Sequence, residues 1–435
     1  MKLAPYPEYK DSGVPWLGKI PAHWELHRGK WLFRKMERPV RSQDEVVTCF
    51  RDGTVTLRKN RRIRGFTESL KEIGYQGIRK GDLVIHQMDA FAGAVGVSDS
   101  DGKGTPVYSV CLPKRDLDTH YYAQLVREMS RSYFITSLAK GIRERSTDFR
   151  FDTFASLTLP VPLPEEQKAI SRFMRNESAQ INKFIRNKRR LIELLKEQKQ
   201  NVINQAVTRG LDPKVKFKPS GVEWIGDIPE HWDARRLKTI AKVVLGKMLK
   251  TSPSKDDQLK PYLRSANIQW FEANLSDVAS MWFSQSEMEQ YRISKNDILV
   301  SEGGEVGRAC IWQDELEECY IQNSVHKVTA GAEVLPLFLL YQFSAFGSKG
   351  AFKAVVNRVS IAHLTREKLV AVFFCKPPIE EQKTILAHIQ AKTAEIDQAI
   401  TRAEREIELM REYRTRLISD VVTGQVDVRN VKGEV

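Results

Sequence analysis

The chain contains the stretch SGVPWLGKIPAHW at residues 12–24 and repeats it as SGVEWIGDIPEHW at residues 220–232. Two glycines, two tryptophans, an Ile-Pro pair and a His-Trp pair recur in the same order, which chance cannot plausibly produce. A repeat of this length indicates two copies of a whole structural unit. The offset from Trp16 to Trp224 is 208 residues, about half of the 435-residue chain.

A second repeated stretch follows each copy of the first. Residues 162–170 read PLPEEQKAI and residues 377–385 read PPIEEQKTI, at an offset of 215 residues. Proline ends the preceding strand, and the acidic residues after it stabilise the positive end of a helix dipole. Each copy therefore predicts the start of a helix, with Glu165 and Glu166 as helix-start charges rather than acid/base catalysts.

The two predicted helices are long. Neither 165–208 nor 380–423 contains proline or glycine, so each can run for roughly 44 residues, about 66 Å. In the second helix, apolar residues recur every seven positions at Ile389, Ile396, Ala403, Met410 and Leu417. The first helix has Met174, Ile181, Leu195 and Val202 at matching positions, with Lys188 interrupting the run.

This spacing is coiled-coil periodicity. A helix with a narrow apolar stripe needs a partner, and the simplest one is the duplicate helix, packed antiparallel. The alternative is that each helix packs on its own globular half or on another subunit.

Composition indicates a globular chain that suits a polyanionic partner. A chain of 435 residues is too long for one hydrophobic core and fits two to four domains. Hydrophobic residues make up 41%, which supplies packed cores. A net charge of +14 suits nucleic acid, although a Lys-rich solvated surface has the same composition.

Cysteine spacing and hydropathy exclude several classes of protein. The five cysteines are scattered, without a Cys-x-x-Cys pair or histidines at finger spacing, so neither a disulfide framework nor a zinc site is predicted. The sequence has no apolar signal core near its first residue and no run of about 18 apolar residues. We therefore expect a soluble, cytoplasmic chain with free thiols and no metal site.

Two longer segments, 25–160 and 233–376, lie between the repeated motifs. Both are patterned as short strands, with one helix predicted at 121–131 and its counterpart at 336–344. The sequence therefore predicts an α+β fold, in which two pseudo-symmetric globular domains are joined by two long antiparallel helices that form a coiled coil.

The two offsets differ, and the difference locates an asymmetry. The His-Trp motif repeats at 208 residues, whereas the predicted strand 81–85 repeats as 296–300, at 215. Seven additional residues must therefore enter the second copy between His-Trp and that strand. The helical frame is predicted to be symmetric and the two globular domains to differ.

The order of these elements resembles the specificity subunits of Type I restriction-modification systems. The resemblance rests on Trp-x-Gly-x-Ile-Pro-x-His-Trp, a variable α+β domain, Glu-Glu-Gln-Lys and a long helix, all present twice over essentially the full chain. Transferred to this sequence, it implies the following division. The boundaries are 1–160 for the first target recognition domain, 161–212 for the first long helix, 213–376 for the second target recognition domain, and 377–435 for the second long helix and C-terminal tail.

The resemblance also implies a function. Each recognition domain would read one half of a bipartite, asymmetric double-stranded DNA target, and the paired helices would separate the domains and dock two methyltransferase subunits. Restriction subunits would join that core. S-adenosylmethionine, ATP and magnesium would be bound by these partners, and this chain would hold no cofactor and carry no catalytic residue. A different class of function is an architectural coiled-coil scaffold that binds other proteins and is basic only incidentally.

Motifs in the sequence support a non-catalytic reader. A methyltransferase of this kind needs an Asn/Asp-Pro-Pro-aromatic loop, and 376–379 has the prolines without the polar and aromatic residues. A phosphate-binding Gly-x-x-x-x-Gly-Lys-Ser/Thr loop is absent from the sequence. The glycines of 302–307 are not followed by a crossover helix, so a dinucleotide site is not predicted there. We interpret His23 and His231 as packing residues beside their tryptophans rather than metal ligands or catalysts.

Candidate DNA-binding residues come from side chains able to reach bases or phosphates. The densest cluster is 58–64, where five cations in seven residues repel one another without an anionic partner; the alternative is a solvated loop. Other candidates flank the glycine turns or the ends of the domains. In the first domain the candidates are Arg58, Lys59, Arg61, Arg62, Arg64, Gln87, Asp89, Arg143 and Arg145. In the second they are Arg264, Asn267, Gln269, Arg308, Asn357 and Arg358.

Overall fold

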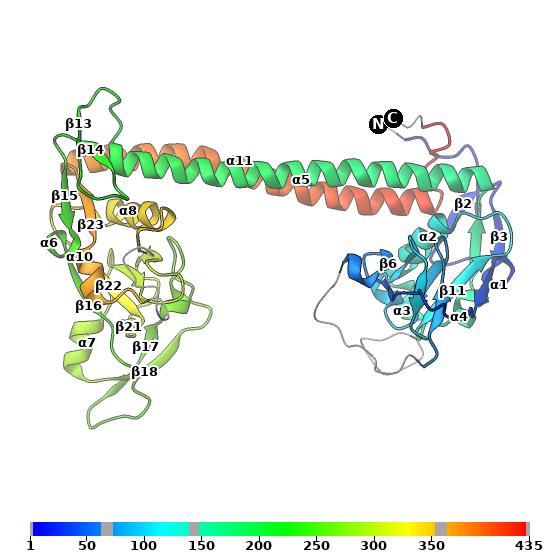
Figure 1. Ribbon diagram of the computed structural model, residues 1–435, viewed down its shortest axis with the longest axis horizontal. Coiled ribbons are helices and arrows are strands. Elements are labelled where there is room, and N and C mark those ends of the chain that lie inside the picture. Colours follow the sequence, from blue (N-terminus) through cyan, green and yellow to red (C-terminus); the bar gives the residue numbers. More distant parts are fainter. Residues whose placement is uncertain (1–2, 62–72, 139–147, 353–362, 432–435) are drawn as a thin grey trace. The chain divides into compact units, whose positions relative to one another are not determined.

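The computed structural model describes residues 3–61, 73–138, 148–352 and 363–431. The chain divides into two compact units (Figure 1). Unit 1 comprises Met1–Lys188 and Arg405–Val435, and unit 2 comprises Arg189–Glu404. Each unit therefore holds one globular part together with one end of each long helix.

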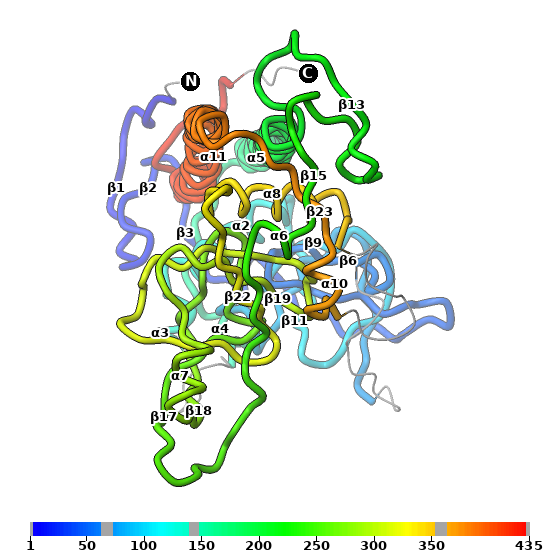
Figure 2. Tube along the Cα trace, turned by 90° about the vertical axis from the view of Figure 1, so that its left-hand side faces the viewer, coloured from blue at the N-terminus to red at the C-terminus, as the bar shows by residue number. Residues whose placement is uncertain are grey.

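The long helices are α5 (Pro164–Arg209) and α11 (Ile379–Val422), as the sequence predicts. In unit 1, the Arg414 guanidinium donates to Asn182 Oδ1 at 3.0 Å. In unit 2, Lys199 Nζ donates to Asp397 Oδ1 at 2.7 Å. Lys188 of α5 also pairs with Glu406 in unit 1, and Gly210, just after α5, lies beside Glu381 in unit 2. Within each unit, partner numbers on α11 therefore fall as those on α5 rise, so the helices are antiparallel, and they lie side by side in Figures 1 and 2.

The coiled-coil stripe is buried at most of the positions that the heptads predict, while Leu195, Val202 and Met410 are half-buried. Ile181, Ile389 and Ile396 are all less than a tenth exposed. Lys188, which interrupts the stripe, keeps its side chain 26% exposed and pairs with Glu406 at 2.5 Å. The heptad prediction is therefore confirmed, and its one polar interruption is neutralised by a carboxylate on the other helix.

Unit 1 contains a four-stranded antiparallel sheet in the order β4-β11-β8-β9. The strands of unit 1 as a whole are β1 (Tyr9–Asp11), β2 (Lys19–Pro21), β3 (Glu25–Arg28), β4 (Phe33–Met36), β5 (Val47–Cys49), β6 (Val55–Leu57), β7 (Gln76–Ile78), β8 (Leu83–His86), β9 (Val95–Val97), β10 (Gly102–Gly104), β11 (Tyr108–Pro113) and β12 (Thr158–Val161). Its shorter helices are α1 (Gly29–Leu32), η1 (Arg58–Asn60), η2 (Ala90–Ala92), α2 (Thr119–Arg131), α3 (Phe134–Ser137) and α4 (Phe151–Ser156).

Unit 2 repeats this sheet in the order β16-β22-β19-β20. Its strands are β13 (Phe217–Pro219), β14 (Asp227–Pro229), β15 (Asp233–Arg236), β16 (Ala241–Leu245), β17 (Gln258–Leu263), β18 (Ala279–Phe283), β19 (Ile298–Ser301), β20 (Ala309–Ile311), β21 (Tyr320–Ile321), β22 (Val325–Ala330) and β23 (Phe373–Lys376). Its shorter helices are α6 (Leu237–Ile240), η3 (Ser265–Asn267), α7 (Gln285–Tyr291), α8 (Pro336–Ser348) and α10 (Arg366–Ala371).

Each core joins the globular part to the ends of the long helices. In unit 1, Ile85 of β8 and Tyr121 of α2 share a buried cluster with Val421 of α11. In unit 2, Val300 of β19 and Phe338 of α8 share a cluster with Val207 of α5. Each globular part therefore shares a hydrophobic core with the helix ends of its own unit and is not joined to them by a flexible linker alone.

The predicted asymmetry lies between the first and third strands of this sheet order. Phe33 at the start of β4 corresponds to Ala241 of β16, at an offset of 208, whereas Leu83 of β8 corresponds to Ile298 of β19, at 215. Between these points unit 1 forms β5, β6 and β7, and unit 2 forms β17, β18 and α7. The seven additional residues therefore belong to a segment that is folded differently in the two units.

Candidate nucleic-acid interface

The two repeated motifs meet at the first turn of α5. The Trp24 indole N–H donates to Glu166 Oε1 at 3.0 Å, and His23 Nε2 lies 2.9 Å from Glu166 Oε2. The Tyr6 hydroxyl donates to Glu166 Oε1 at 2.6 Å, and the Glu166 side chain is only 2% exposed. We call these four residues the Glu166 anchor.

The same arrangement recurs at the first turn of α11. The Trp232 indole N–H donates to Glu381 Oε2 at 3.0 Å, and His231 Nε2 lies 2.8 Å from the same oxygen. The Glu381 side chain is 29% exposed. We call these three residues the Glu381 anchor. Both histidines lie beside their tryptophans, as predicted, and each also contacts a carboxylate, which the sequence did not predict.

The glutamine after each anchor carboxylate ties the long helix to a helix of the globular part. Gln167 Oε1 accepts from the backbone N–H of Asp118, the residue that caps α2. Gln382 Oε1 accepts from the backbone N–H of Leu335, the residue that caps α8. Sequence reasoning missed this role, although the repeated Glu-Glu-Gln triplet is a signal for it.

The ends of the long helices close on the same anchors. Gly424 follows α11 with a φ of 78°, and an added Cβ would lie 2.8 Å from the Trp24 ring. Gly210 follows α5 with a φ of 72°, and its Cβ would lie 3.2 Å from the Trp232 ring. A left-handed residue without a side chain is needed at both places. Each anchor therefore holds the start of one long helix, the end of the other and a globular part.

In unit 1, the predicted cationic cluster already has acidic partners. Lys59 pairs with Glu45 at 2.5 Å, and Arg61 pairs with Asp52 at 2.7 Å. The Arg61 hydrogen bond lowers the pKa of Asp52 to about 2. The argument that these cations lack an anionic partner is therefore wrong for Lys59 and Arg61. Arg58 lies on η1 with Lys59, Arg61 directly follows η1, and Arg62 and Arg64 lie outside the described residues.

A turn at residues 51–53 joins this cluster to the β8 turn. Arg51 pairs with Asp89 at 2.9 Å, while its neighbour Asp52 holds Arg61. The Arg127 guanidinium donates to the Gly93 carbonyl at 2.6 Å and to the Arg51 carbonyl at 3.3 Å, which fixes both turns. The structure thus brings Arg61 and Asp89 to one surface.

Other candidates of unit 1 are placed less completely. The Gln87 amide lies 3.4 Å from Ser109 Oγ, beside Asp89. Arg143 and Arg145 lie outside the described residues. Sequence reasoning missed Arg51 and Arg127, because a single arginine in a turn or on a helix carries no pattern of its own.

In unit 2, the loop around η3 gathers Arg264, Gln269 and Arg308. Arg264 forms an ion pair with Asp277, and Arg308 donates to the Ser265 carbonyl at 3.2 Å. The Gln269 amide donates to the Ala266 carbonyl at 3.2 Å, and the residue stays partly exposed. Asn357 and Arg358 lie outside the described residues.

Asn267 corrects one prediction. Its side chain is buried, with 3% of the residue exposed, and both amide hydrogens are donated, to the carbonyls of Asn274 at 2.9 Å and Asp277 at 3.0 Å. Its Oδ1 accepts from the Arg264 backbone N–H at 3.0 Å. Asn267 therefore organises the loop and has no donor left for a base edge.

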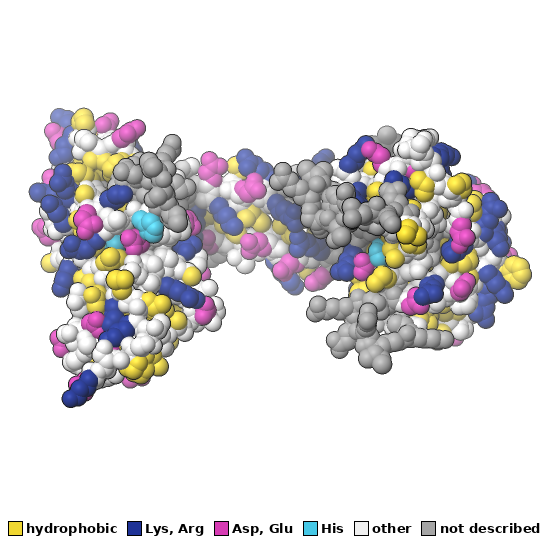
Figure 3. Space-filling model, turned by 60° about the horizontal axis from the view of Figure 1, so that its bottom comes forward, with side chains coloured by type: hydrophobic (Ala, Val, Ile, Leu, Met, Phe, Trp, Pro, Cys, Tyr) yellow, Lys and Arg dark blue, Asp and Glu magenta, His cyan; other side chains and the backbone are white. Residues whose placement is uncertain are grey.

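Both surfaces share one chemical design. Arg51 and Arg61 in unit 1, and Arg264 in unit 2, are held by carboxylates of their own unit. A guanidinium held in this way keeps further N–H donors for base edges or phosphates. Lys and Arg side chains are interspersed with acidic ones over the visible face (Figure 3). The arrangement can recognise an anionic, hydrogen-bonding surface.

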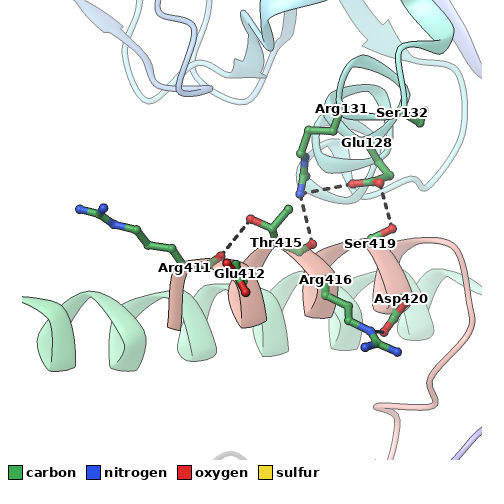
Figure 4. Close-up of a pocket in the computed structure, with 9 residues that line it drawn as sticks. All are labelled: Glu128, Arg131, Ser132, Arg411, Glu412, Thr415, Arg416, Ser419 and Asp420. Carbon is green, nitrogen blue, oxygen red and sulfur yellow. Dashed lines mark hydrogen bonds and ion pairs between the residues drawn. The ribbon is translucent and has the colours of Figure 1, made fainter. Parts of the chain in front are cut away.

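A groove of about 560 Å³ lies between α2 and α11 in unit 1 (Figure 4). Arg131 lies 3.3 Å from Glu128 and donates to the Thr415 carbonyl at 3.5 Å. Ser419 Oγ donates to Glu128 Oε1 at 2.9 Å. These contacts across the groove attach α2 to α11, and they assign no ligand to it.

Metal sites, reactive thiols and membrane-spanning helices are three other kinds of feature that could define a function. Within it, His, Cys, Asp and Glu side chains nowhere gather in groups of three or more that could hold a metal ion. The five cysteines are buried and free, and burial raises the pKa of Cys49 and Cys375 to about 12. Among the helices of the described residues, none has the length and apolar character needed to cross a membrane.

The sequence is similar to those of known type I restriction enzyme specificity subunits. A family model described as the Type I restriction modification DNA specificity domain matches residues 229–409. The MjaX type I restriction enzyme specificity subunit of Methanocaldococcus jannaschii is 21% identical, over 95% of this chain and 96% of its own length. The MjaVIII specificity subunit of the same organism is 22% identical over 68% of each chain.

Solved structures share the fold. The HsdS subunit of Thermoanaerobacter tengcongensis superposes with a TM-score of 0.57 at 16% identity, covering 96% of this chain and all of that one. A chain from a study of assembly and conformational transition in the type I R-M system superposes with a TM-score of 0.67 at 15% identity, covering 94% and 99%. The two-part fold with long helices is thus common to these proteins.

Proposed function

Since the chain belongs to the family of Type I restriction-modification specificity subunits, we propose that it reads a bipartite, asymmetric DNA target, one half with each globular part. The reading domains are those predicted at 1–160 and 213–376. The paired helices dock two methyltransferase subunits, and restriction subunits join this core. The chain itself is a non-catalytic reader, and S-adenosylmethionine, ATP and magnesium are bound by its partners.

One observation carries this proposal: a repeated frame holds two different surfaces. The four-stranded sheet and the carboxylate anchor recur in both units, whereas the segment between β4 and β8 differs from that between β16 and β19. Arginines stand on both surfaces, on η1 and the 51–53 turn in unit 1 and around η3 in unit 2. Two unlike arginine-bearing surfaces on a common frame suit two unlike half-sites.

A binding selection tests the proposal. The full chain, purified with its methyltransferase subunit, is used to retain duplexes from a randomised library at about 150 mM salt, where non-specific phosphate binding is weakened. We expect retained duplexes to share two different conserved blocks separated by an unread spacer of fixed length. Retention without any shared sequence would contradict the proposal and favour the architectural scaffold, whose basic charge has no reading role.

A further inference from the structure

Trp31 stands out among the tryptophans of the chain. All eight lie within the described residues, and Trp31, which is 63% exposed, is the one whose side chain is mostly in solvent. It lies on α1, next to the buried residue Leu32. A single exposed apolar side chain needs no explanation by itself, so its surroundings decide what it means.

One cation lies over this indole, and three more lie close to α1 in the fold or along the chain. Lys30 Nζ lies 5.2 Å from the centroid of the Trp31 ring, and Lys114 Nζ donates to the Lys30 carbonyl at 2.8 Å. The Arg28 guanidinium is held by a backbone carbonyl at the end of α4, and Arg115 follows Lys114 as an exposed residue. We call Trp31 and these four cations the Trp31 patch.

Among the described residues the four cations form no ion pair, although Arg115 lies near enough to Glu25 to help lower the pKa of that carboxyl. Across the described residues, no carboxylate lies within 4.0 Å of a charged nitrogen of the four cations. The acidic residues nearest in sequence each have another partner: Glu25 lies against His27, Glu37 against Lys35 and Asp116 against Lys168. This differs from the arginines of the reading surfaces, which are held by carboxylates.

Unit 2 lacks the Trp31 patch. The backbone N–H of Lys114 donates to the Leu32 carbonyl in unit 1, and that of Gly331 donates to the Ile240 carbonyl in unit 2, so these positions correspond. Glycine therefore replaces Lys114, and Thr239 stands where unit 1 has Trp31. At this pair of described positions only unit 1 has an aromatic side chain, although the frame beneath it is shared.

The Trp31 patch is also separate from the reading surface of unit 1. In Figure 1, α1 and β6 lie on opposite sides of unit 1, and η1, which carries Arg58 and is followed by Arg61, comes directly after β6. In Figure 3, the outer edge of unit 1 shows hydrophobic surface among Lys and Arg side chains. A duplex held at η1 would not place its bases at α1.

We infer that the Trp31 patch is a docking point for a protein with an acidic surface and an apolar pocket that receives the indole. Tryptophan and arginine are the side chains that dominate binding energy at protein interfaces, and charge complementarity orients the partners. Duplex DNA would satisfy the cations but offers the indole no apolar pocket. The inference rests on the proposed function, under which the partner is one of two methyltransferase subunits. Because the Trp31 patch is present in unit 1 and lacking in unit 2, the two methyltransferase copies bind with unequal affinity.

A titration of the full chain with its methyltransferase subunit tests this inference. Stoichiometry is read by native mass spectrometry and the two dissociation constants by calorimetry. For Trp31→Ala we expect the dissociation constant of one methyltransferase copy to rise at least tenfold and that of the other copy to stay unchanged. Thr239→Ala, at the corresponding position of unit 2, is the matched control and should change neither constant. Lys114→Glu should weaken the same copy as Trp31→Ala.

The other outcomes separate the inference from the proposed function. Thermal melting of Trp31→Ala should match the wild type, because the residue is mostly exposed. Unchanged binding of both copies to Trp31→Ala would overturn the inference and leave the proposed function intact. Loss of DNA binding by this variant without the methyltransferase would identify a nucleic-acid surface and also overturn it. A wild-type chain that binds no methyltransferase would overturn the proposed function, and the inference with it.

Discussion

The two units of this chain hold the same frame together with different chemistry. At the first turn of α5, the buried Glu166 side chain accepts hydrogen bonds from Tyr6 and Trp24 and lies against His23. At the first turn of α11, Glu381 has Trp232 and His231 as neighbours and stays partly open to water. A carboxylate removed from water depends fully on its donors, whereas an open one can exchange them for solvent.

The helix contacts repeat this contrast. Unit 1 attaches α2 to α11 through Glu128 and Arg131, which contact Ser419 and the Thr415 carbonyl (Figure 4). Unit 2 attaches α8 to α5 through neutral groups: Ser348 Oγ lies 3.4 Å from Asn204 Nδ2. The contacts lie at corresponding places in the two units, but they involve charged side chains in unit 1 and neutral polar side chains in unit 2. The duplicated fold thus keeps the positions of these contacts while their chemistry differs.

The largest expected effect breaks the comparison at the anchors. Glu166→Ala leaves the Trp24 and Tyr6 donors buried without an acceptor, and we expect it to cost about 3–5 kcal/mol of unfolding free energy. Glu381→Ala, at a partly exposed carboxylate with fewer donors, should cost about 1–2 kcal/mol. Urea denaturation followed by tryptophan fluorescence measures both. Glu166→Gln keeps an acceptor and should lose less than Glu166→Ala; equal losses at the two alanine variants would contradict the contrast between the anchors.

A smaller effect sharpens the comparison at the reading surfaces. The Arg61 hydrogen bond holds the pKa of Asp52 at about 2, below its ordinary value. The ion pair therefore contributes fully above about pH 4 and is lost as the pH falls through 2. Because both side chains are about half exposed, its contribution stays below about 1 kcal/mol.

Carboxyl-labelled aspartate provides the measurement for Asp52. The resonance missing from the spectrum of Asp52→Asn identifies this residue, and we expect it to remain mostly ionised at pH 3. Half-titration near pH 4 would show that Arg61 does not hold the carboxylate in solution. The 51–53 turn would then be less ordered than the loop around η3, which Asn267 fixes through three hydrogen bonds.

The frame could be predicted from sequence because local patterns determine it. The absence of proline and glycine, together with the seven-residue spacing, predicts α5 and α11, and the change of offset locates the segment that differs between the units. The acceptors of the anchors could not be predicted, because Glu166 meets Trp24 across 142 residues and the acidic pair also fits a simple helix start. Spacing cannot show which of two adjacent carboxylates turns inward.

Individual reading residues are harder to predict, because side-chain burial in irregular loops leaves no periodic signal. Asn267 has the chemistry of a base reader, yet it is used entirely within its own loop. Arg51 has no neighbouring pattern, yet it joins the two predicted groups of unit 1. The roles assigned to Arg61, Arg264, Gln269 and Arg308 remain predictions.

The central claim is that each unit reads its own half-site, and one measurement tests it most directly. Modified adenines are mapped across the genome of cells that carry the complete system with the wild-type chain, Arg61→Ala or Arg264→Ala. We predict a wild-type motif of two unlike blocks, with one block relaxed by Arg61→Ala and the other by Arg264→Ala. A single undivided motif, or relaxation of the same block by both substitutions, would contradict the account.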